Sequence, residues 1–326
     1  MDALQLENQW KKLIDKKGNG FITMKIDAKC KPDLDLGINS KKRRCLLLRL
    51  PKGTKTNFRG ETKENLKTSY FVKENCIVLE LIDEYYYTLF NDLIISLFFK
   101  IKDVENHLEY KATFISTINK WSAFLANSRN NKLSEDVIKG MFGELTVLKE
   151  LLINTTPQKV NSILKSWQGP YDANTDFVFD NKNIEVKTKS IDNSKVKISS
   201  EHQLDDEPGK SMELLVVSVE SNYNSKETIE SLTSTVKDSI LKLNGDLSIL
   251  FEALAQKSLF PSNLKEYNNY KFTLKQHIIY DCNLVLDKNK VFPRLIKSKL
   301  PIHLSKVKYS VNLQELEGFI TTIKSF

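Results

Sequence analysis

The stretch of sequence that decides the fold is Thr175-Asp176-Phe177-Val178-Phe179-Asp180-Asn181-Lys182-Asn183-Ile184-Glu185-Val186-Lys187. Two apolar runs flank the turn-forming residues 180–183, so the segment predicts two antiparallel strands joined by a short turn. Side chains alternate between the two faces of a strand. We therefore expect Glu185 and Lys187 on one face of the second strand, with the neighbouring apolar residues on the other.

The register of this hairpin places its polar groups. A loop of two or four residues would set Asp176 opposite Lys187 and Val178 opposite Glu185, with Asp176 and Glu185 as diagonal neighbours about 7–8 Å apart. Two carboxylates at that separation can share a hard divalent cation through oxygen ligands. Lys187 can then orient and deprotonate an attacking water or stabilise charge on a phosphate. The segment predicts a metal-dependent phosphodiesterase centre.

The Glu-x-Lys pattern alone has little specificity. Glu61-Thr62-Lys63 is a second copy, but it lies in a polar stretch with no acidic strand before it. An isolated pair of this kind in a lysine-rich chain is usually a surface ion pair, and an upstream acid on a paired strand is what distinguishes the copy at 185–187. Asp172 is an alternative to Asp176, although it precedes the apolar strand and is expected in the loop.

A helix predicted over 134–153 supplies a further acid. Ser134 is a suitable N-cap residue, and the acids after it favour the first turn. The apolar residues of the helix define one arc at about 100° per residue, and Glu144 falls inside that arc. A carboxylate directed at a core is costly unless it is paired or bound to a metal. The alternative is a boundary residue that reaches water. Gly140 and Gly143 each cost the helix about 1 kcal/mol relative to Ala, which predicts a close backbone approach.

The rest of the chain predicts a mixed α/β protein. The helix at 134–153 is followed by strands at 175–180, 184–190 and 195–199, a short helix after Ser200, a strand at 213–219 and a helix at about 226–243. Upstream we expect a helix within 1–18, strands at 21–26, 45–50, 69–71 and 76–82, and helices at 84–101 and 108–126. Downstream we expect strands at 270–274, 278–286 and 306–311 and a closing helix near 313–323.

These elements suggest three regions. A β-rich basic region covers 1–127, a core with the order α-β-β-β-α-β covers 128–255, and an α+β region covers 256–326. Residues 127–131 are the predicted linker between the first two.

Composition excludes several classes of protein. The chain has 326 residues, 40% of them hydrophobic and 28% charged, as in ordinary soluble globular proteins. Its four Cys and four His are scattered, which predicts neither a disulfide framework nor a zinc site. The first residues lack a secretory signal, and no apolar run is long enough to span a bilayer. We therefore expect a cytoplasmic protein without a membrane partner.

The positive charge is concentrated near the N-terminus. The formal net charge is +8, and residues 1–70 hold 17 Lys and Arg against 8 Asp and Glu. Such concentration suits contacts with phosphate, although a solvated face is the alternative. The residues that we expect to bind DNA are Lys41, Lys42, Arg43, Arg44 and Arg59.

Together these motifs resemble a known superfamily. The element order, with a helix Glu, a strand Asp and then Glu-x-Lys, resembles the restriction-endonuclease-like PD-(D/E)XK superfamily. The segments that more narrowly resemble one bacterial PD-(D/E)XK family, found in restriction-modification and phage-defence gene clusters, are 143–145, 167–170, 175–177, 185–188, 198–204 and 292–294. The resemblance is densest over 140–205. One departure is Thr175, which stands where the motif has Pro.

The resemblance implies a fold, a chemistry and a set of residue roles. It implies an αβββαβ core with a mixed central sheet, Mg²⁺ (or Mn²⁺) as cofactor, and DNA as substrate. Asp176 and Glu185 would be metal ligands, Lys187 the catalytic lysine, Glu144 a helix acid that assists the metal or the water, and Gln203 a polar residue lining the site. Partners would be other restriction or defence subunits, such as a methyltransferase, an ATPase or a helicase, or a second copy of the chain.

Two other functions remain open from the sequence. The chain could be a DNA-binding subunit that keeps the nuclease fold without cleaving. It could also be a scaffold whose basic N-terminal region docks an acidic protein, which would leave Glu144 unexplained.

Overall fold

The computed structural model describes residues 1, 3–16, 20–54, 56, 58–63, 65–125, 132–288, 290–296, 299–301, 303 and 305–326. The chain divides into two compact units. The first unit comprises Met1–Arg129 and Phe260–Ser262, and the second comprises Asn130–Leu259 and Asn263–Phe326. The linker predicted at 127–131 lies outside the described residues.

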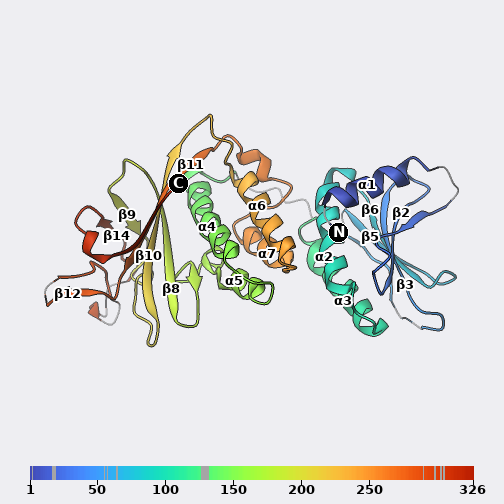
Figure 1. The fold of residues 1–326 in the computed structure, drawn as a ribbon, viewed down its shortest axis with the longest axis horizontal. Helices are drawn as coiled ribbons and strands as arrows, with labels where there is room; N and C mark the ends of the chain where they lie inside the picture. Colours follow the sequence, from blue (N-terminus) through green and yellow to red (C-terminus); the bar gives the residue numbers. More distant parts are fainter. Residues whose placement is uncertain are drawn as a thin grey trace. The chain divides into compact units, whose positions relative to one another are not determined.

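The first unit is built on an antiparallel six-stranded sheet with the order β1-β2-β3-β6-β5-β4 (Figure 1). Its strands are β1 (Ile22–Lys25), β2 (Asp33–Ile38), β3 (Arg44–Arg49), β4 (Thr62–Lys63), β5 (Leu66–Phe71) and β6 (Cys76–Leu81). Its helices are α1 (Ala3–Ile14), η1 (Glu84–Tyr86), α2 (Tyr87–Ile101) and α3 (His107–Ser122). The sequence did not predict β2, because Asp and Gly disfavour strands, yet Leu34, Leu36 and Ile38 are buried in the sheet.

The second unit is built on a mixed five-stranded sheet with the order β15-β11-β10-β8-β7. Its strands are β7 (Phe177–Val178), β8 (Lys182–Ser190), β10 (Ser211–Ser221), β11 (Phe272–Asp281) and β15 (Ile320–Ser325). Strand β10 runs parallel to β8 and antiparallel to β11. The helices are α4 (Glu135–Ile153), α5 (Val160–Ser166), η2 (Gly169–Tyr171), α6 (Ile229–Lys242), α7 (Leu247–Gln256), η3 (Leu264–Tyr267) and η5 (Glu317–Phe319).

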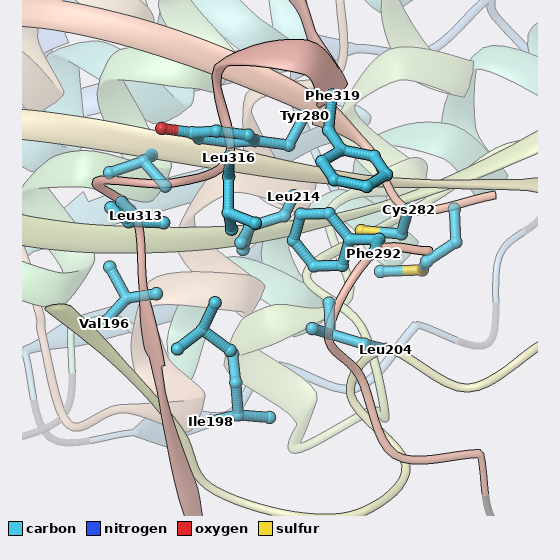
Figure 2. Close-up of a cluster of buried hydrophobic side chains, with 13 residues drawn as sticks. Val196, Ile198, Leu204, Leu214, Tyr280, Cys282, Phe292, Leu313, Leu316 and Phe319 are labelled. Atoms are coloured by element: carbon cyan, nitrogen blue, oxygen red, sulfur yellow. The ribbon is translucent and has the colours of Figure 1, made fainter. Parts of the chain in front are cut away.

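The two faces of this sheet are covered differently. Figure 1 shows α4 and α6 beside one face, while β9 (Lys195–Ile198) and β14 (Tyr309–Asn312) lie beyond the other. Strands β9 and β14 pair only with each other, in an antiparallel ribbon. A hydrophobic cluster joins this ribbon to the sheet (Figure 2), with Ile198 and Val311 packed in the same core as Leu214 and Tyr280. A further pair, β12 (Val285–Asp287) and β13 (Lys290–Val291), completes the described strands.

Three expectations for this unit are wrong. The strand predicted at 195–199 exists as β9, but it is not part of the central sheet. Residues 201–204 form turns rather than a short helix. The predicted closing helix is absent, since residues 320–325 form the edge strand β15 against β11. The run Ile320-Thr321-Thr322-Ile323 is β-branched throughout, and pairing with β11 satisfies its backbone.

Helix α4 begins as predicted and approaches the sheet at one glycine. The Ser134 hydroxyl accepts a hydrogen bond from the Val137 N–H at 3.5 Å. A Cβ atom at Gly143 would lie only 1.8 Å from Thr188 Oγ1 on β8, whereas one at Gly140 would meet nothing within 4 Å. The close approach predicted for both glycines is therefore confirmed for Gly143 and wrong for Gly140.

The two glycines provide a matched test of this packing. Gly140→Ala should stabilise the protein by about 0.5–1 kcal/mol, because it adds helix propensity without a clash. Gly143→Ala should destabilise it by about 1–3 kcal/mol, because Thr188 is a short, stiff side chain that cannot move aside. Urea unfolding of both variants measures the difference, and equal effects of the two substitutions would contradict the packing described.

Candidate active site

The hairpin of β7 and β8 has a tighter turn than the register argument assumed. Phe177 pairs with Ile184 and Val178 with Asn183. The Phe179 N–H donates to the Lys182 carbonyl at 2.8 Å, which leaves only Asp180 and Asn181 in the turn. Continued by one residue, this register sets Asp176 opposite Glu185. The predicted pairings of Asp176 with Lys187 and of Val178 with Glu185 are wrong by two residues, a shift that leaves each side chain on its expected face.

Asp176 lies directly before the short strand β7 begins. Its Oδ2 accepts a hydrogen bond from the Val186 N–H at 2.7 Å, so the carboxylate replaces the backbone acceptor that a longer strand would supply. Its carbonyl oxygen accepts from the N–H groups of Gln168 at 2.7 Å and Gly169 at 3.0 Å. Asp176 is thus fixed through its side chain and its backbone, by strand β8 on one side and by the 167–169 segment on the other.

Glu144 approaches Asp176 from helix α4. The Trp167 indole N–H donates to Glu144 Oε2 at 2.7 Å. A Cβ atom at Gly169 would lie 2.5 Å from that same oxygen and 2.5 Å from Asp176 Oδ1. Both carboxylates therefore border residue 169, and only glycine leaves room for them there.

Glu185 is the most deeply buried acid of the group, with 1% of its surface exposed. Within the described part of the chain, Lys187 is the one close partner of its Oε1, and its Oε2 has no hydrogen-bond partner. Its Oε1 lies 2.6 Å from Lys187 Nζ, an ion pair on the same strand. A buried carboxylate with so few partners is costly, which is the condition that a bound cation relieves.

Lys187 is held by the turn that follows β9. Its Nζ donates to Gln203 Oε1 at 3.1 Å, and the Ser199 N–H donates to the same oxygen at 2.6 Å. Gln203, expected to line the site, therefore links Lys187 to the end of β9.

The electrostatics of the three acids favour protons or a cation. Burial, followed by the charge of Asp176, raises the pKa of Glu144 to about 8. Burial also raises the pKa of Asp176, against the opposing hydrogen bond from Val186. The pKa of Glu185 is raised well above its ordinary value, first by burial and then by the charge of Asp176. Three carboxyls with raised pKa values in one place are typical of a functional site rather than of a structural ion-pair network.

Sequence reasoning missed two residues of this neighbourhood. Trp167 is fully buried, as a core residue would be, but its indole also donates to Glu144. Lys257, just after α7, forms an ion pair with Asp172, and its charge lowers the pKa values of both Glu144 and Asp176. No spacing links Lys257 to the motif, so only the fold could bring it there. Asp172 lies in the turn after η2, with its side chain 87% exposed.

The acids that meet here suit an oxygen-binding divalent cation. No three His, Cys, Asp or Glu side chains of the described residues form a complete metal-binding set by themselves. Mg²⁺ does not need one, because it is commonly held by one or two carboxylates, with waters and phosphate oxygens as its other ligands. The Glu185 carboxylate, whose Oε2 has no hydrogen-bond partner, and the neighbouring carboxylate of Asp176 fit that requirement. Glu144 borders the same glycine as Asp176.

The basic residues predicted to bind DNA lie in the first unit. Arg43 forms an ion pair with Glu80 at 2.9 Å. Arg44 pairs with Glu84 at 3.4 Å and lies over the rings of Trp10 and Tyr87. Both arginines are thus engaged within the unit. The remaining candidates, Lys41, Lys42 and Arg59, are exposed.

The acids and the lysine described above first indicate a class of protein. A helix acid, a strand acid and a Glu-x-Lys strand on a mixed α/β sheet are the arrangement of a nuclease-like protein. The chain matches, over residues 6–314, the family described as "Putative PD-(D/E)XK family member, (DUF4420)", and it belongs to that family. No curated protein and no solved structure matches it. Among the helices of the described residues, none has the length and apolar character that crossing a membrane requires.

The raised pKa of Glu144 predicts a pH dependence of stability. Between about pH 5 and pH 8 the folded chain keeps a proton that the unfolded chain has released, so the free energy of unfolding should fall as the pH rises. Each such carboxyl contributes at most about 1.4 kcal/mol per pH unit. Urea unfolding in EDTA should show this slope, and Glu144→Gln should flatten it. Glu135→Gln, an exposed acid on the same helix, is the control. Equal slopes for wild type and Glu144→Gln would contradict the assignment.

Proposed function

We propose that this protein is a metal-dependent endonuclease that hydrolyses DNA phosphodiester bonds, acting in the cytoplasm as the nuclease component of a bacterial restriction or phage-defence system. One observation carries the proposal. The buried carboxylate of Glu185 lies beside Lys187 and within the electrostatic reach of Asp176 and Glu144, and its Oε2 has no hydrogen-bond partner among the described residues. The family supports a nuclease-like protein. The biological setting rests on the resemblance of the motifs to a family found in restriction-modification and phage-defence gene clusters.

The proposed fold is a variant of the αβββαβ core. Helix α4 and strands β7, β8, β9 and β10 follow in the expected order. Turns at 201–204 take the place of the second helix, and β9 pairs with β14 instead of joining the sheet. This variation still leaves Glu144 on α4, Asp176 directly before β7 and Glu185 on β8 in one neighbourhood. The proposed metal site requires this grouping.

The residues would share the chemistry as follows. Asp176 and Glu185 would hold Mg²⁺ or Mn²⁺, assisted by Glu144, and the bound ion supplies Lewis-acid activation of the phosphate and of water. Lys187, held by Gln203 and Glu185, stabilises negative charge on the phosphate as an ammonium or, once it has released its own proton to solvent, accepts the proton of the attacking water at Nζ. The water oxygen forms the new bond to phosphorus, the bond to the leaving oxygen breaks, and that oxygen takes up a proton.

Trp167 and Val186 have positioning roles in this scheme. The Trp167 N–H fixes Glu144 Oε2, and the Val186 N–H fixes Asp176 Oδ2. Each acid therefore keeps its second oxygen available. Site groups held in this way need little reorganisation during the reaction.

The catalytic test compares variants of the proposed site residues with a control variant on strand β8. Glu185→Gln, Asp176→Asn and Lys187→Met should each lower Mg²⁺-dependent cleavage of plasmid DNA by about 10²-fold or more, because each removes a ligand or the group beside the water. Glu144→Gln should have a smaller effect. The control is Lys189→Met, two residues further along the same strand. Calorimetry should show weakened Mg²⁺ binding for Asp176→Asn and Glu185→Gln.

The stability of the lysine variant needs its own control. Lys187 is the ion-pair partner of buried Glu185, so Lys187→Met leaves an unpaired buried carboxyl. The double variant Glu185→Gln/Lys187→Met restores a neutral pair, so it should recover stability without recovering cleavage. The assays belong both on the isolated protein and in cells challenged with phage. A wild type silent in both settings, or a Lys187→Met protein that restricts as well as wild type, would favour the non-cleaving DNA-binding subunit.

A further inference from the structure

A row of exposed lysines lies along the ribbon of β9 and β14. The register runs from Lys195 opposite Asn312 to Ile198 opposite Tyr309. Val196, Ile198 and Val311 are buried in the cluster of Figure 2. The alternate residues, Lys195 and Lys197, therefore face away from the core and are exposed.

The segment that leads into β14 adds two lysines. Residues 194–199 are Ser-Lys-Val-Lys-Ile-Ser and residues 305–310 are Ser-Lys-Val-Lys-Tyr-Ser. Lys306 and Lys308 lie just before β14, which begins at Tyr309, and both are exposed. The pairing with β9 ends at Tyr309, opposite Ile198, and the chain bends at Lys306, whose φ is positive. At about 3.3–3.4 Å per residue, Lys195 and Lys197 lie about 7 Å apart along β9.

No acid offsets the charge of this surface. Neither 194–199 nor 305–312 contains Asp or Glu. Across the described ranges, none of the four lysines forms an ion pair with an acidic side chain. Glu201, in the turns that follow β9, is 4% exposed, and its carboxylate accepts the N–H groups of Lys306 at 3.2 Å and Val307 at 2.9 Å. That carboxylate anchors the backbone of the ribbon rather than pairing with its lysines.

Both strands of the ribbon end beside the candidate active site. The Ser199 N–H, directly after β9, bonds the Gln203 oxygen that also accepts from Lys187. Tyr309, the first residue of β14, pairs with Ile198 and therefore lies at this same end of the ribbon. A polyanion lying on the ribbon would therefore lead to Lys187 and Glu185.

We infer that the outward face of the β9–β14 ribbon, with Lys195, Lys197, Lys306 and Lys308, binds the phosphate backbone of duplex DNA and directs it to the candidate site. The inference rests on the proposed function, which makes DNA the substrate. A two-stranded ribbon fits the major groove of B-DNA, and lysines on its surface can neutralise phosphates. This inference places the main DNA contact on the ribbon rather than on residues 41–44, where Arg43 and Arg44 already form ion pairs.

The test compares two sets of substitutions with the same change in charge. The ribbon variant replaces Lys195, Lys197, Lys306 and Lys308 by Gln, and the control variant replaces Lys159, Lys165, Lys226 and Lys242, which are exposed elsewhere in the second unit. Each set lowers the net charge of +8 by four. Binding to a short duplex is measured in EDTA, where no cleavage occurs, at several salt concentrations. The pair variant Lys195→Gln/Lys197→Gln keeps the test usable if the larger set does not fold.

The expected result is a change in salt dependence confined to the ribbon. The log–log slope of affinity against salt should flatten by about 0.9 for each phosphate that a lysine no longer neutralises, so by up to about 3.6 for the ribbon variant and about 1.8 for the pair variant. The control variant should keep the wild-type slope. Equal slopes for the ribbon and control variants, or no duplex binding by wild type, would overturn the inference. Because the assay does not depend on cleavage, a wild type that binds through the ribbon but never cuts would refute the proposed nuclease and leave the ribbon assignment standing.

Discussion

The repulsion among three carboxylates in a desolvated place is the constraint on which the second unit depends. Glu144 comes from a helix, Asp176 from the residue before β7 and Glu185 from β8, and burial is the first cause of the raised pKa of each. Burying even one such charge costs several kcal/mol unless it is paired and hydrogen-bonded. A sequence selected only for stability would replace Glu185 by an apolar residue, as at most other buried positions of the central strands. Keeping three acids there is understandable if a cation or a proton enters with them.

The surrounding structure supports these acids one by one. Asp176 receives a backbone N–H from β8 because β7 is too short to supply an acceptor there, and Glu144 receives the Trp167 indole. Gly169 has no side chain to occupy the space beside both, and Gly143 lets helix α4 approach β8 closely enough to bring Glu144 in. Among the described residues, Glu185 has the Lys187 ammonium beside its Oε1 and no donor at its Oε2. The acid with the fewest partners is therefore the one whose surroundings most favour an added ligand.

Local patterns predicted part of this arrangement, and long-range pairing decided the rest. Helix α4 and its Ser134 cap were predicted from the sequence pattern. The predicted register of the hairpin was wrong by two residues, but such a shift leaves each side chain of β8 on the same face. The edge strand β15 could not be predicted as readily, because its partner β11 lies far away in sequence. Lys257 and the pairing of β9 with β14 were missed for the same reason. The density of charge in residues 1–70 was visible, but the sequence does not reveal that Arg43 and Arg44 already have partners.

The raised pKa values connect the occupancy of the site to pH. A carboxyl with a pKa of about 8, as at Glu144, holds its proton at neutral pH when no cation is present. A metal ligand must be ionised, so binding of a cation by this group would release a proton, and the affinity would rise with pH. Bringing the acids close together therefore does more than assemble ligands. Without a cation, the carboxyls take up protons and lose their charge. The fold can then tolerate all three before substrate and cation arrive. Lys187 adds to this balance, since the charge that lowers the pKa of Asp176 and Glu185 is the same charge that the proposed reaction places beside the phosphate.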